Sequence, residues 1–386
     1  MANNIFENFK KVDCCGCSAC ETICGKNAIT LQYDDQGFLY PNVDTHKCVN
    51  CGLCTKVCPS FDKKITKLDL CYAVKRTEIE KMKSSSSGGF AAALSEFVVS
   101  NGGVVYGVAY EPFPHVATIR VDNIKDLEKL KGSKYVQTDP SKSFHDVLID
   151  LKSGQFVAYF GTSCHINGLL NYLQLKKVSI DSLLTIDLIC HGVPSPRLFE
   201  EYISWLSKKK KVTGFDFRTK VNGWGGGSIN FYPTIYYGAN QECNTLKSWG
   251  YTKLFFSNNC LRPFCYNCPY AGKGRSGDFS IADYWDVEKV FPDFYSKQGV
   301  SLVFVNNIKA QHFFSKLNNI EVKLSKYGLG MERQANLIKP SSISPRYDEF
   351  WIDYKNGGIV CVLKKYAQLS FVAQIKHKLK KVLKRK

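Results

Sequence analysis

Two runs of cysteine near the N-terminus constrain the fold of this chain more than any other feature. Residues 14–24 read CCGCSACETIC, and residues 48–59 read CVNCGLCTKVCP. Both runs contain the spacing C-x2-C-x2-C-x3-C, in which three cysteines bind one [4Fe–4S] cluster and the fourth reaches a second cluster. The spacing therefore predicts a pair of [4Fe–4S] clusters within residues 1–62.

The exchange of the fourth cysteine between the clusters, as in bacterial two-cluster ferredoxins, assigns the ligands. One set is Cys14, Cys17, Cys20 and Cys58, and the other is Cys48, Cys51, Cys54 and Cys24. Residues 28–44, between the runs, have the pattern of a small hairpin. Cys15 is an additional cysteine that this spacing does not use. Zinc is the alternative metal, but zinc sites generally use separated C-x2-C pairs rather than two runs of four.

Composition limits the class of protein. The chain has 386 residues, 17 cysteines and a formal net charge of +18. Clustered cysteines in a reducing compartment bind metal or do redox work. The sequence has no signal-peptide pattern and no apolar run of about 18 residues, so we expect a cytoplasmic protein. The positive charge suits an acidic partner or a membrane surface, and no nucleic-acid recognition motif is present, so we expect no nucleic acid.

The rest of the chain has the pattern of an α/β domain. Residues 102–110, 155–161 and 183–190 read as strands, and the last two are apolar enough to be parallel and buried on both faces. A helix is predicted at 165–176, between them. The expected fold class is α+β or α/β, with a ferredoxin-like two-cluster module followed by an α/β catalytic domain with a mixed sheet. We divide this body into residues 70–150, 151–350 and a basic tail, 351–386.

A serine- and glycine-rich segment precedes a predicted helix. Residues 83–103 read KSSSSGGFAAALSEFVVSNGG, with apolar residues at helical spacing from Phe90 onward. Free N–H groups at the start of such a helix can bind phosphate. The alternative is an ordinary helix cap after a flexible turn.

Two predicted strands end in polar loops that contain cysteine. These loops are GTSCH at 161–165 and CHGVPSPR at 190–197. Open α/β sheets bind ligands beyond the carboxyl ends of their strands, so Cys164 and Cys190 are expected at the edge of the site. His165 and His191 follow them and are the candidate catalytic residues, with a structural role as the alternative.

A third group of cysteines lies in LRPFCYNCPYA and just before it. Cys260, Cys265 and Cys268 would need a fourth thiolate to hold a cluster. Cys190 is the preferred fourth ligand and Cys164 the alternative. A zinc site or a redox pair formed by Cys265 and Cys268 are the other interpretations.

Seven short motifs occur in order along residues 70–350. They are KSSSSGGF (83–90), KYVQTD (134–139), GTSCHINGL (161–169), DLICHGVPSP (187–196), LRPFCYNCPYA (261–271), GDFSIADYWD (277–286) and GVSLVFVN (299–306). Together they resemble the coenzyme F420 hydrogenase/dehydrogenase beta-subunit family, with a ferredoxin domain fused in front. The resemblance implies an iron–sulfur flavoprotein that binds FAD beside a [4Fe–4S] cluster. It also implies the flavin-contact candidates Ser86, Ser87, Gly88, Gly89, Tyr135, Gln137, Thr162, Ser163, Gly277, Asp278 and Asp283.

The expected function is electron transfer from a ferredoxin-like donor through the clusters to FAD and on to an organic hydride acceptor. The acceptor would be F420-like or another reducible metabolite, with surface-polysaccharide metabolism as a candidate context. GTSCH and IADYW depart from the family's usual Gly-Thr-Pro-Cys-Gln and Ile-Gly-Asp-Phe-Trp, which leaves the acceptor open. The alternative function is a non-catalytic electron-transfer subunit of a larger redox complex.

The last residues, FVAQIKHKLKKVLKRK, combine an apolar stripe with many basic side chains. Phe371, Ile375, Leu379 and Val382 recur at helical spacing. Such a segment is typical of an interfacial helix that contacts anionic lipid or an acidic partner. A peripheral contact at the inner face of the membrane is therefore expected, and a solvated tail is the alternative.

Overall fold

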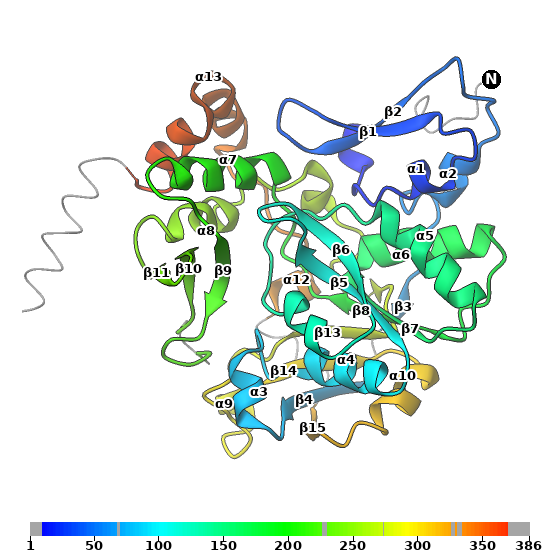
Figure 1. The fold of residues 1–386 in the computed structure, drawn as a ribbon, viewed down its shortest axis with the longest axis vertical. Helices are drawn as coiled ribbons and strands as arrows, with labels where there is room; N and C mark the ends of the chain where they lie inside the picture. Colours follow the sequence, from blue (N-terminus) through cyan, green and yellow to red (C-terminus); the bar gives the residue numbers. More distant parts are fainter. Residues whose placement is uncertain are drawn as a thin grey trace, which may run out of the picture.

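The computed structural model describes residues 10–67, 70–225, 230–272, 274–325, 329 and 334–369. Its N-terminal module is drawn in blue in Figure 1. The module consists of η1 (Lys11–Asp13), α1 (Ala19–Ile23), β1 (Ile29–Tyr33), β2 (Leu39–Val43) and α2 (Leu53–Val57). β1 and β2 pair antiparallel, with Ile29 opposite Val43. The hairpin predicted between the cysteine runs is confirmed.

An eight-stranded mixed sheet forms the centre of the body, in the order β15-β4-β14-β13-β8-β7-β5-β6. The strands are β4 (Leu70–Arg76), β5 (Val104–Tyr110), β6 (Val116–Val121), β7 (Val157–Thr162), β8 (Leu183–Leu188), β13 (Phe279–Asp283), β14 (Ser301–Val305) and β15 (Ile320–Ser325). β5, β7, β8 and β13 run parallel, and the other pairs are antiparallel. The predicted mixed sheet is confirmed, and the three predicted strands are β5, β7 and β8.

Helices pack on both faces of this sheet (Figure 1). They include α3 (Ile79–Lys83), α4 (Phe90–Ser100), η2 (Lys125–Leu130), α5 (Ser141–Lys152), α6 (Ser163–Leu175), α9 (Val287–Val290) and α10 (Ile308–Phe314). The position of β7 inside the sheet explains why its sequence is apolar throughout. Val157 and Tyr159 belong to the core that contains α5 and α6, whereas Ala158 belongs to the core that contains α4. Successive side chains of a strand point to opposite faces, so both faces need apolar residues.

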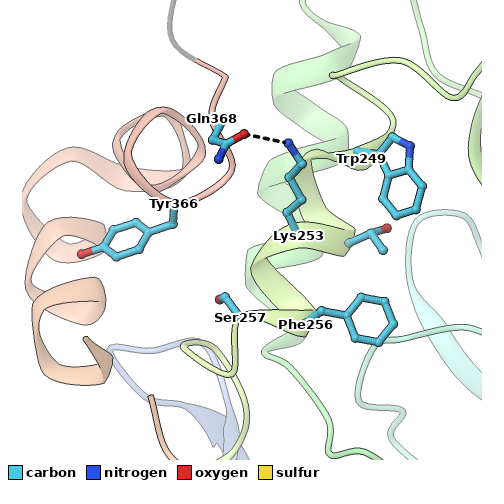
Figure 2. Close-up of a pocket in the computed structure, with 7 residues that line it drawn as sticks. Trp249, Lys253, Phe256, Ser257, Tyr366 and Gln368 are labelled. Carbon is cyan, nitrogen blue, oxygen red and sulfur yellow. Dashed lines mark hydrogen bonds between the residues drawn. The ribbon is translucent and has the colours of Figure 1, made fainter. Parts of the chain in front are cut away.

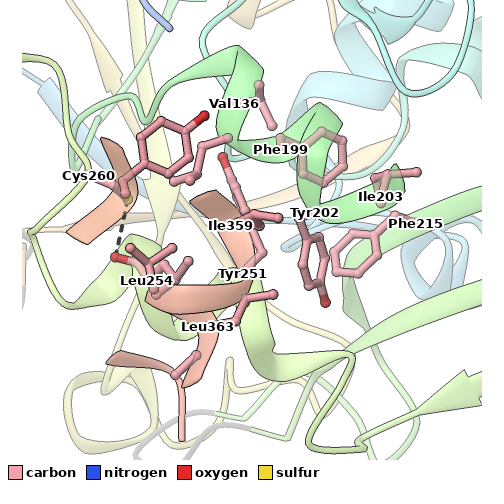
Figure 3. Close-up of a cluster of buried hydrophobic side chains, with 14 of the residues drawn as sticks. Val136, Phe199, Tyr202, Ile203, Phe215, Tyr251, Leu254, Cys260, Ile359 and Leu363 are labelled. Carbon is pink, nitrogen blue, oxygen red and sulfur yellow. Dashed lines mark hydrogen bonds between the residues drawn. The ribbon is translucent and has the colours of Figure 1, made fainter. Parts of the chain in front are cut away.

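A second, three-stranded sheet lies beside the first. It comprises β9 (Gly214–Thr219), β10 (Tyr232–Tyr237) and β11 (Asn240–Cys243), with α7 (Pro196–Ser207), α8 (Trp249–Phe256) and α13 (Tyr347–Tyr366). Figure 3 shows the aromatic core between these elements, with Phe199, Tyr202 and Tyr251 at its centre. The sequence did not predict this sheet. The expected boundary at residue 351 falls inside α13, and the other domain boundaries remain predictions.

Four further short elements are described. They are β3 (Thr66–Lys67), η3 (Pro263–Asn267), β12 (Gly274–Arg275) and α12 (Ala335–Ile338). β3 pairs with β12 and so joins the segment after the module to the body. No helix in the described ranges is long and apolar enough to cross a membrane. The basic stripe from Phe371 to Val382 lies outside the described residues.

α6 carries the surface on which the N-terminal module rests. Asn171 Nδ2 donates to the carbonyl oxygens of Val57 at 3.3 Å and Asp62 at 2.8 Å. A Cβ on Gly168 would lie 2.9 Å from the Cys17 sulfur, so the close approach depends on this glycine. The core that contains Tyr172 also includes apolar residues of the module. The module is thus packed against the sheet domain through buried contacts.

A buried ion pair next to this junction is expected to be essential for stability. Asp187 Oδ1 accepts from Arg275 Nε at 2.8 Å, and its Oδ2 accepts from Gly277 N and Ser280 Oγ. Both charged side chains are almost completely buried. Asp187→Asn leaves the guanidinium uncompensated, so we expect the free energy of unfolding to fall by about 3 to 5 kcal/mol.

Urea unfolding followed by circular dichroism measures this change. Asp293→Asn is the control, because Asp293 is exposed in its ion pair with Lys323 and its loss should change stability little. Equal losses of unfolding free energy in the two variants would contradict the prediction that the buried ion pair contributes more to stability than the exposed one.

Candidate iron–sulfur and redox site

The first expected set of ligands comes together in the N-terminal module. Cys58 follows α2, and Cys14, Cys17 and Cys20 lie around the start of α1. Burial raises the pKa of Cys20 well above its usual range, and the nearby thiolates of Cys14 and Cys58 raise it further. Burial also raises the pKa of Cys58 to about 11, with a further contribution from Cys14. These thiols would release protons when they bind iron.

The second expected set lines one cavity. Cys24, at the end of α1, faces Cys48, Cys51 and Cys54 there, with Ile29, Val43, Val49 and Leu53 among the apolar neighbours. Ala28 N lies 3.3 Å from Cys24 Sγ and donates a hydrogen bond to it. Backbone N–H groups aimed at sulfur are one of the means by which a protein tunes a cluster. Cys51 is exposed, whereas Cys54 is buried, so this set lies nearer to solvent than the first.

A third group of four cysteines converges at the carboxyl edge of the parallel strands. Its members are Cys164, Cys190, Cys265 and Cys268. Burial raises the pKa of Cys190 to about 12, and the charges of Cys164 and Cys268 raise it further. Burial also raises the pKa of Cys265, with further contributions from the other three thiols of the group. Gly192 N donates to Cys190 Sγ at 3.3 Å, and Val193 N donates to Cys265 Sγ at 3.5 Å.

Cys260 lies elsewhere. Its Sγ donates to the carbonyl oxygen of Leu254, in α8, at 3.3 Å. Figure 3 shows this contact inside the aromatic core, where Cys260 is 0% exposed. The expected third set joined Cys260, Cys265 and Cys268 with Cys190 or, alternatively, Cys164. The structure places Cys164 and Cys190 together near Cys265 and Cys268, with Cys260 apart from them, and the ligands of a third cluster remain a prediction.

Cys15 links the first and third groups. Its buried side chain packs in one cluster with Cys17 and Cys164. Sequence analysis left Cys15 without a role, because the ligand spacing does not use it. In the described part of the chain, no three His, Cys, Asp or Glu side chains converge closely enough to hold a single metal ion. The cysteine groups are therefore sets of neighbouring thiols rather than closed single-ion sites.

The serine- and glycine-rich loop lies between α3 and α4. Ser87 Oγ donates to the carbonyl oxygen of Val300 at 3.0 Å, and Ser133 Oγ donates to Ser86 Oγ at 3.2 Å. A Cβ on Gly88 would lie 2.4 Å from the carbonyl oxygen of Val74. Gly88 is therefore required by close packing against β4. Gly89 has φ +89° and begins α4, as expected for the turn into this helix.

A polar and aromatic group lies beyond the end of β13. Arg218 donates two hydrogen bonds to Asp283, at 2.7 and 3.0 Å, and Trp224 Nε1 donates to the same carboxylate. The ring of Tyr135 stacks on Phe255 at 4.7 Å, and burial raises the pKa of its hydroxyl while the nearby Arg218 charge opposes this shift. Of the expected flavin contacts, Tyr135 and Asp283 therefore share one network.

Lys220 connects this network to the serine-rich loop. Its ammonium group donates to the carbonyl oxygens of Met82, Ser87 and Gln298. Burial lowers the pKa of Lys220 to about 7, and the nearby Arg218 charge lowers it further. Trp224 and Trp285 stack in parallel at 5.0 Å on the other side of Asp283. The sequence patterns did not indicate Lys220, Arg218 or the two tryptophans as site residues.

The other expected flavin contacts do not join this network. Gly277 and Asp278 lie at the opposite end of β13 from Asp283, where Asp278 accepts from Thr185. Gln137 contacts the N-terminal module instead, because its Nε2 donates to the carbonyl oxygen of Cys15 at 3.2 Å. Thr162 and Ser163 begin α6 beside Cys164. The Thr162 hydroxyl lies 3.3 Å from the Cys164 sulfur.

The two candidate histidines differ in environment. His191 Nε2 lies 2.7 Å from Asn258 Oδ1, and its ring packs against Phe255. Because Phe255 also stacks on Tyr135, His191 lies next to the polar and aromatic group. His165 is buried within α6, and this burial lowers its pKa to about 4, with help from the charge of Arg262. Its position does not favour proton exchange with a substrate, so His191 is the stronger candidate.

An open groove lies away from the cysteines, next to the end of the described chain. Figure 2 shows Trp249, Lys253 and Phe256 of α8 on one side and Tyr366 and Gln368 on the other. Lys253 Nζ donates to Gln368 Oε1 at 3.5 Å. None of the expected site residues lines this groove.

The buried state of His165 predicts a pH dependence of stability. The unfolded histidine has a pKa near 6.5, so between about pH 6.5 and pH 4 the unfolded chain binds more protons. Stability is therefore lost on acidification through this range, by about 3 kcal/mol from this residue. In His165→Gln the loss between about pH 7.5 and pH 4.5 should be smaller by that amount in urea unfolding of the metal-free protein. Identical losses in both proteins would contradict the prediction.

Comparison with known proteins finds matches for the N-terminal module and for a large part of the body. Residues 154–327 match the family described as coenzyme F420 hydrogenase/dehydrogenase, in the C-terminal part of its beta subunit. Residues 13–61 match the 4Fe–4S dicluster domain. Among solved structures, a chain of the xenon-derivatised F420-reducing [NiFe] hydrogenase complex from Methanosarcina barkeri is 17% identical, with a TM-score of 0.46, covering 79% of this chain and 93% of that chain. No curated protein matches the chain.

The two matches agree with the cysteine groups of the N-terminal module and with the mixed α/β sheet of the body. Residues 154–327 are thus similar to the beta subunits of coenzyme F420 hydrogenases and dehydrogenases, and residues 13–61 are similar to a 4Fe–4S dicluster domain.

Proposed function

We propose that the chain is an oxidoreductase that passes single electrons from a ferredoxin-like donor through three [4Fe–4S] clusters to FAD, for hydride transfer to an organic acceptor. The acceptor is F420-like or another reducible metabolite. The observation that carries the proposal is the packing of Cys15, Cys17 and Cys164 in one buried cluster, where a Cβ on Gly168 of α6 would lie 2.9 Å from the Cys17 sulfur. It brings the first cysteine group of the ferredoxin-type domain next to the third group in the body.

The order of the three cysteine groups suits an electron path from the surface to the interior. The second set is the entry side, because Cys51 is exposed there. The first set is reached next, since Cys54 of the second set is among the charges that act on Cys20. The third set follows across Cys15 and Cys164. This arrangement supports a donor protein that docks at the ferredoxin-type domain.

The third group has the composition that a four-iron cluster requires. Four thiols converge there, and Gly192 N and Val193 N donate to two of the sulfurs. Arg275 supplies a nearby positive charge that acts on Cys190 and Cys268. We therefore assign its ligands as Cys164, Cys190, Cys265 and Cys268.

FAD, when bound, would supply the exchange between one-electron and two-electron chemistry. The polar and aromatic group around Asp283 is the proposed place for it. Ser86 and Ser87 offer hydroxyls on the loop next to Lys220, Tyr135 offers an aromatic face, and His191 stands between this group and Cys190. In this proposal His191 holds or delivers a proton at its ring nitrogen, while its buried apolar neighbour Phe255 excludes water.

A non-catalytic electron-transfer subunit is the alternative. It would have the same cysteine groups and would need a partner enzyme to act on the substrate. Flavin content separates the two functions, since a chain that only transfers electrons needs no FAD of its own.

Iron content tests the ligand assignment. The anaerobically reconstituted protein should hold about twelve irons per chain and one FAD, because three cubes of four irons are proposed. Cys265→Ser should remove about four of these irons. Cys260→Ser is the matched control, since Cys260 lies in the same segment but is hydrogen-bonded to the carbonyl oxygen of Leu254. This variant should retain all of the irons.

The outcomes exclude different parts of the proposal. About eight irons in the unaltered chain would exclude the third cluster. Loss of iron in Cys260→Ser with retention in Cys164→Ser would restore the ligand set expected from sequence. Twelve irons without FAD would favour the non-catalytic subunit.

We also propose that the basic C-terminal segment contacts anionic membrane lipid. Its residues combine Phe371, Ile375 and Leu379 with many lysines, which is the composition of an interfacial helix. The full chain should float with vesicles that contain phosphatidylglycerol at low salt, and a chain truncated after residue 369 should not. Equal flotation of both chains would exclude this role of the tail.

A further inference from the structure

Arg262 is completely buried between the N-terminal module and the body. It is 0% exposed and follows Cys260 by two residues. Its Nε donates to the carbonyl oxygen of Cys14 at 2.6 Å, and its Nη2 donates to that of Leu39 at 3.0 Å. Its Nη1 donates to Gln137 Oε1 at 3.0 Å. The guanidinium also lies over the ring of Tyr40, 4.1 Å from its centre.

All of these partners are neutral, which sets Arg262 apart. Three other arginines are buried in the described part of the chain, and each pairs with a carboxylate. Arg76 pairs with Glu96, Arg218 with Asp283 and Arg275 with Asp187. None of the ion pairs of the described residues involves Arg262. A guanidinium stays charged even when buried, and a buried charge without a counter-charge is costly.

Burial lowers the pKa of Arg262, but the neighbouring Cys14, Tyr40 and Cys15 side chains, when they are ionised, raise it above its usual value. The backbone of the first cysteine run lies against the guanidinium, since a Cβ on Gly16 would be 2.9 Å from Nη1. A [4Fe–4S] cluster with four thiolates is an anion, and reduction makes it more negative.

We propose that Arg262 is the buried counter-charge of the cluster held by Cys14, Cys17, Cys20 and Cys58, and that it raises the reduction potential of this cluster. This inference rests on the proposed function, because it requires a cluster at the first cysteine group. In a buried site of low dielectric constant, a fixed positive charge favours the more negative, reduced state. Arg262 is a positioning residue with an electrostatic role, and it keeps electrons on the cluster next to Cys15.

The potential of each cluster, followed by EPR in a redox titration of the anaerobic full-length protein, tests this inference. Arg262→Gln should make reduction of one cluster at least tenfold less favourable, which is a shift of about 59 mV to more negative potential for one electron. The equilibrium constants for reduction of the other clusters should change by less than threefold. Arg262→Lys retains the charge and should also stay within threefold.

A second variant keeps the arginine in place. Gln137→Glu puts a carboxylate beside Nη1 and neutralises the guanidinium, so it should shift the same cluster in the same direction as Arg262→Gln. Gln137→Glu still tests the role of Arg262 if Arg262→Gln does not retain its iron. Asn171→Ala is the control for a loosened junction, because it removes two hydrogen bonds to the N-terminal module without a change in charge, and it should leave the potential unchanged.

The results distinguish the inference from the function on which it rests. If the unaltered protein binds no cluster at the first group, the proposed function fails. If all variants keep their iron and neither Arg262→Gln nor Gln137→Glu moves a potential, the role of Arg262 is excluded while the proposed function stands. An equal shift in Asn171→Ala or in Arg262→Lys would show a structural effect instead of a charge effect, and would also overturn the inference.

Discussion

The packing of the first cysteine run against α6 is the interaction on which the arrangement of the molecule depends. Cys15 belongs to the first cysteine run, and Cys164 lies in the first turn of α6, just beyond the end of β7. Their side chains belong to one buried cluster because the N-terminal module is held over α6. A displacement of the module by the width of one side chain would separate its cysteines from those that follow β7 and β8.

Buried polar groups fix this position. Asn171 holds the end of the second cysteine run through Val57 and Asp62, and Gln137 and Arg262 hold the first run through Cys15 and Cys14. Apolar packing supplies attraction between two surfaces, but it tolerates sliding. Hydrogen bonds that would be left unmade in a buried position penalise every other arrangement. The junction therefore combines an apolar contact with a small number of directional bonds, as a path for electrons requires.

The sequence predicted those features that spacing along the chain determines. The hairpin of the module and the strands β5, β7 and β8 follow from local pattern, and the four cysteines of the second set line one cavity. Cys260 shows the limit of such reasoning. Its closeness to Cys265 in sequence suggested a shared role, but the end of α8 turns its sulfur toward Leu254. Spacing does not specify the direction of a side chain outside a regular repeat.

The polar and aromatic group was predictable only in part, for the same reason. Tyr135 and Asp283 were named from short motifs, whereas Arg218, Lys220 and Trp224 reach them from β9 and the segment after it. Nothing local marks those residues, because their partners lie about 60 to 130 residues away along the chain. Gly277 and Asp278 do not belong to this group, because they precede β13 whereas Asp283 ends it. The five residues of the strand separate the two ends of the motif, although the motif is continuous in sequence.

The central claim is that a third cluster lies directly beside the ferredoxin-type pair. The EPR spectrum of the fully reduced protein tests it, since neighbouring paramagnetic clusters broaden and split one another's signals. We expect a spin-coupled spectrum that becomes simpler in Cys268→Ser, when the third cluster is lost, and does not change in Cys260→Ser. A spectrum that is the same in Cys268→Ser and in the unaltered chain would contradict the account.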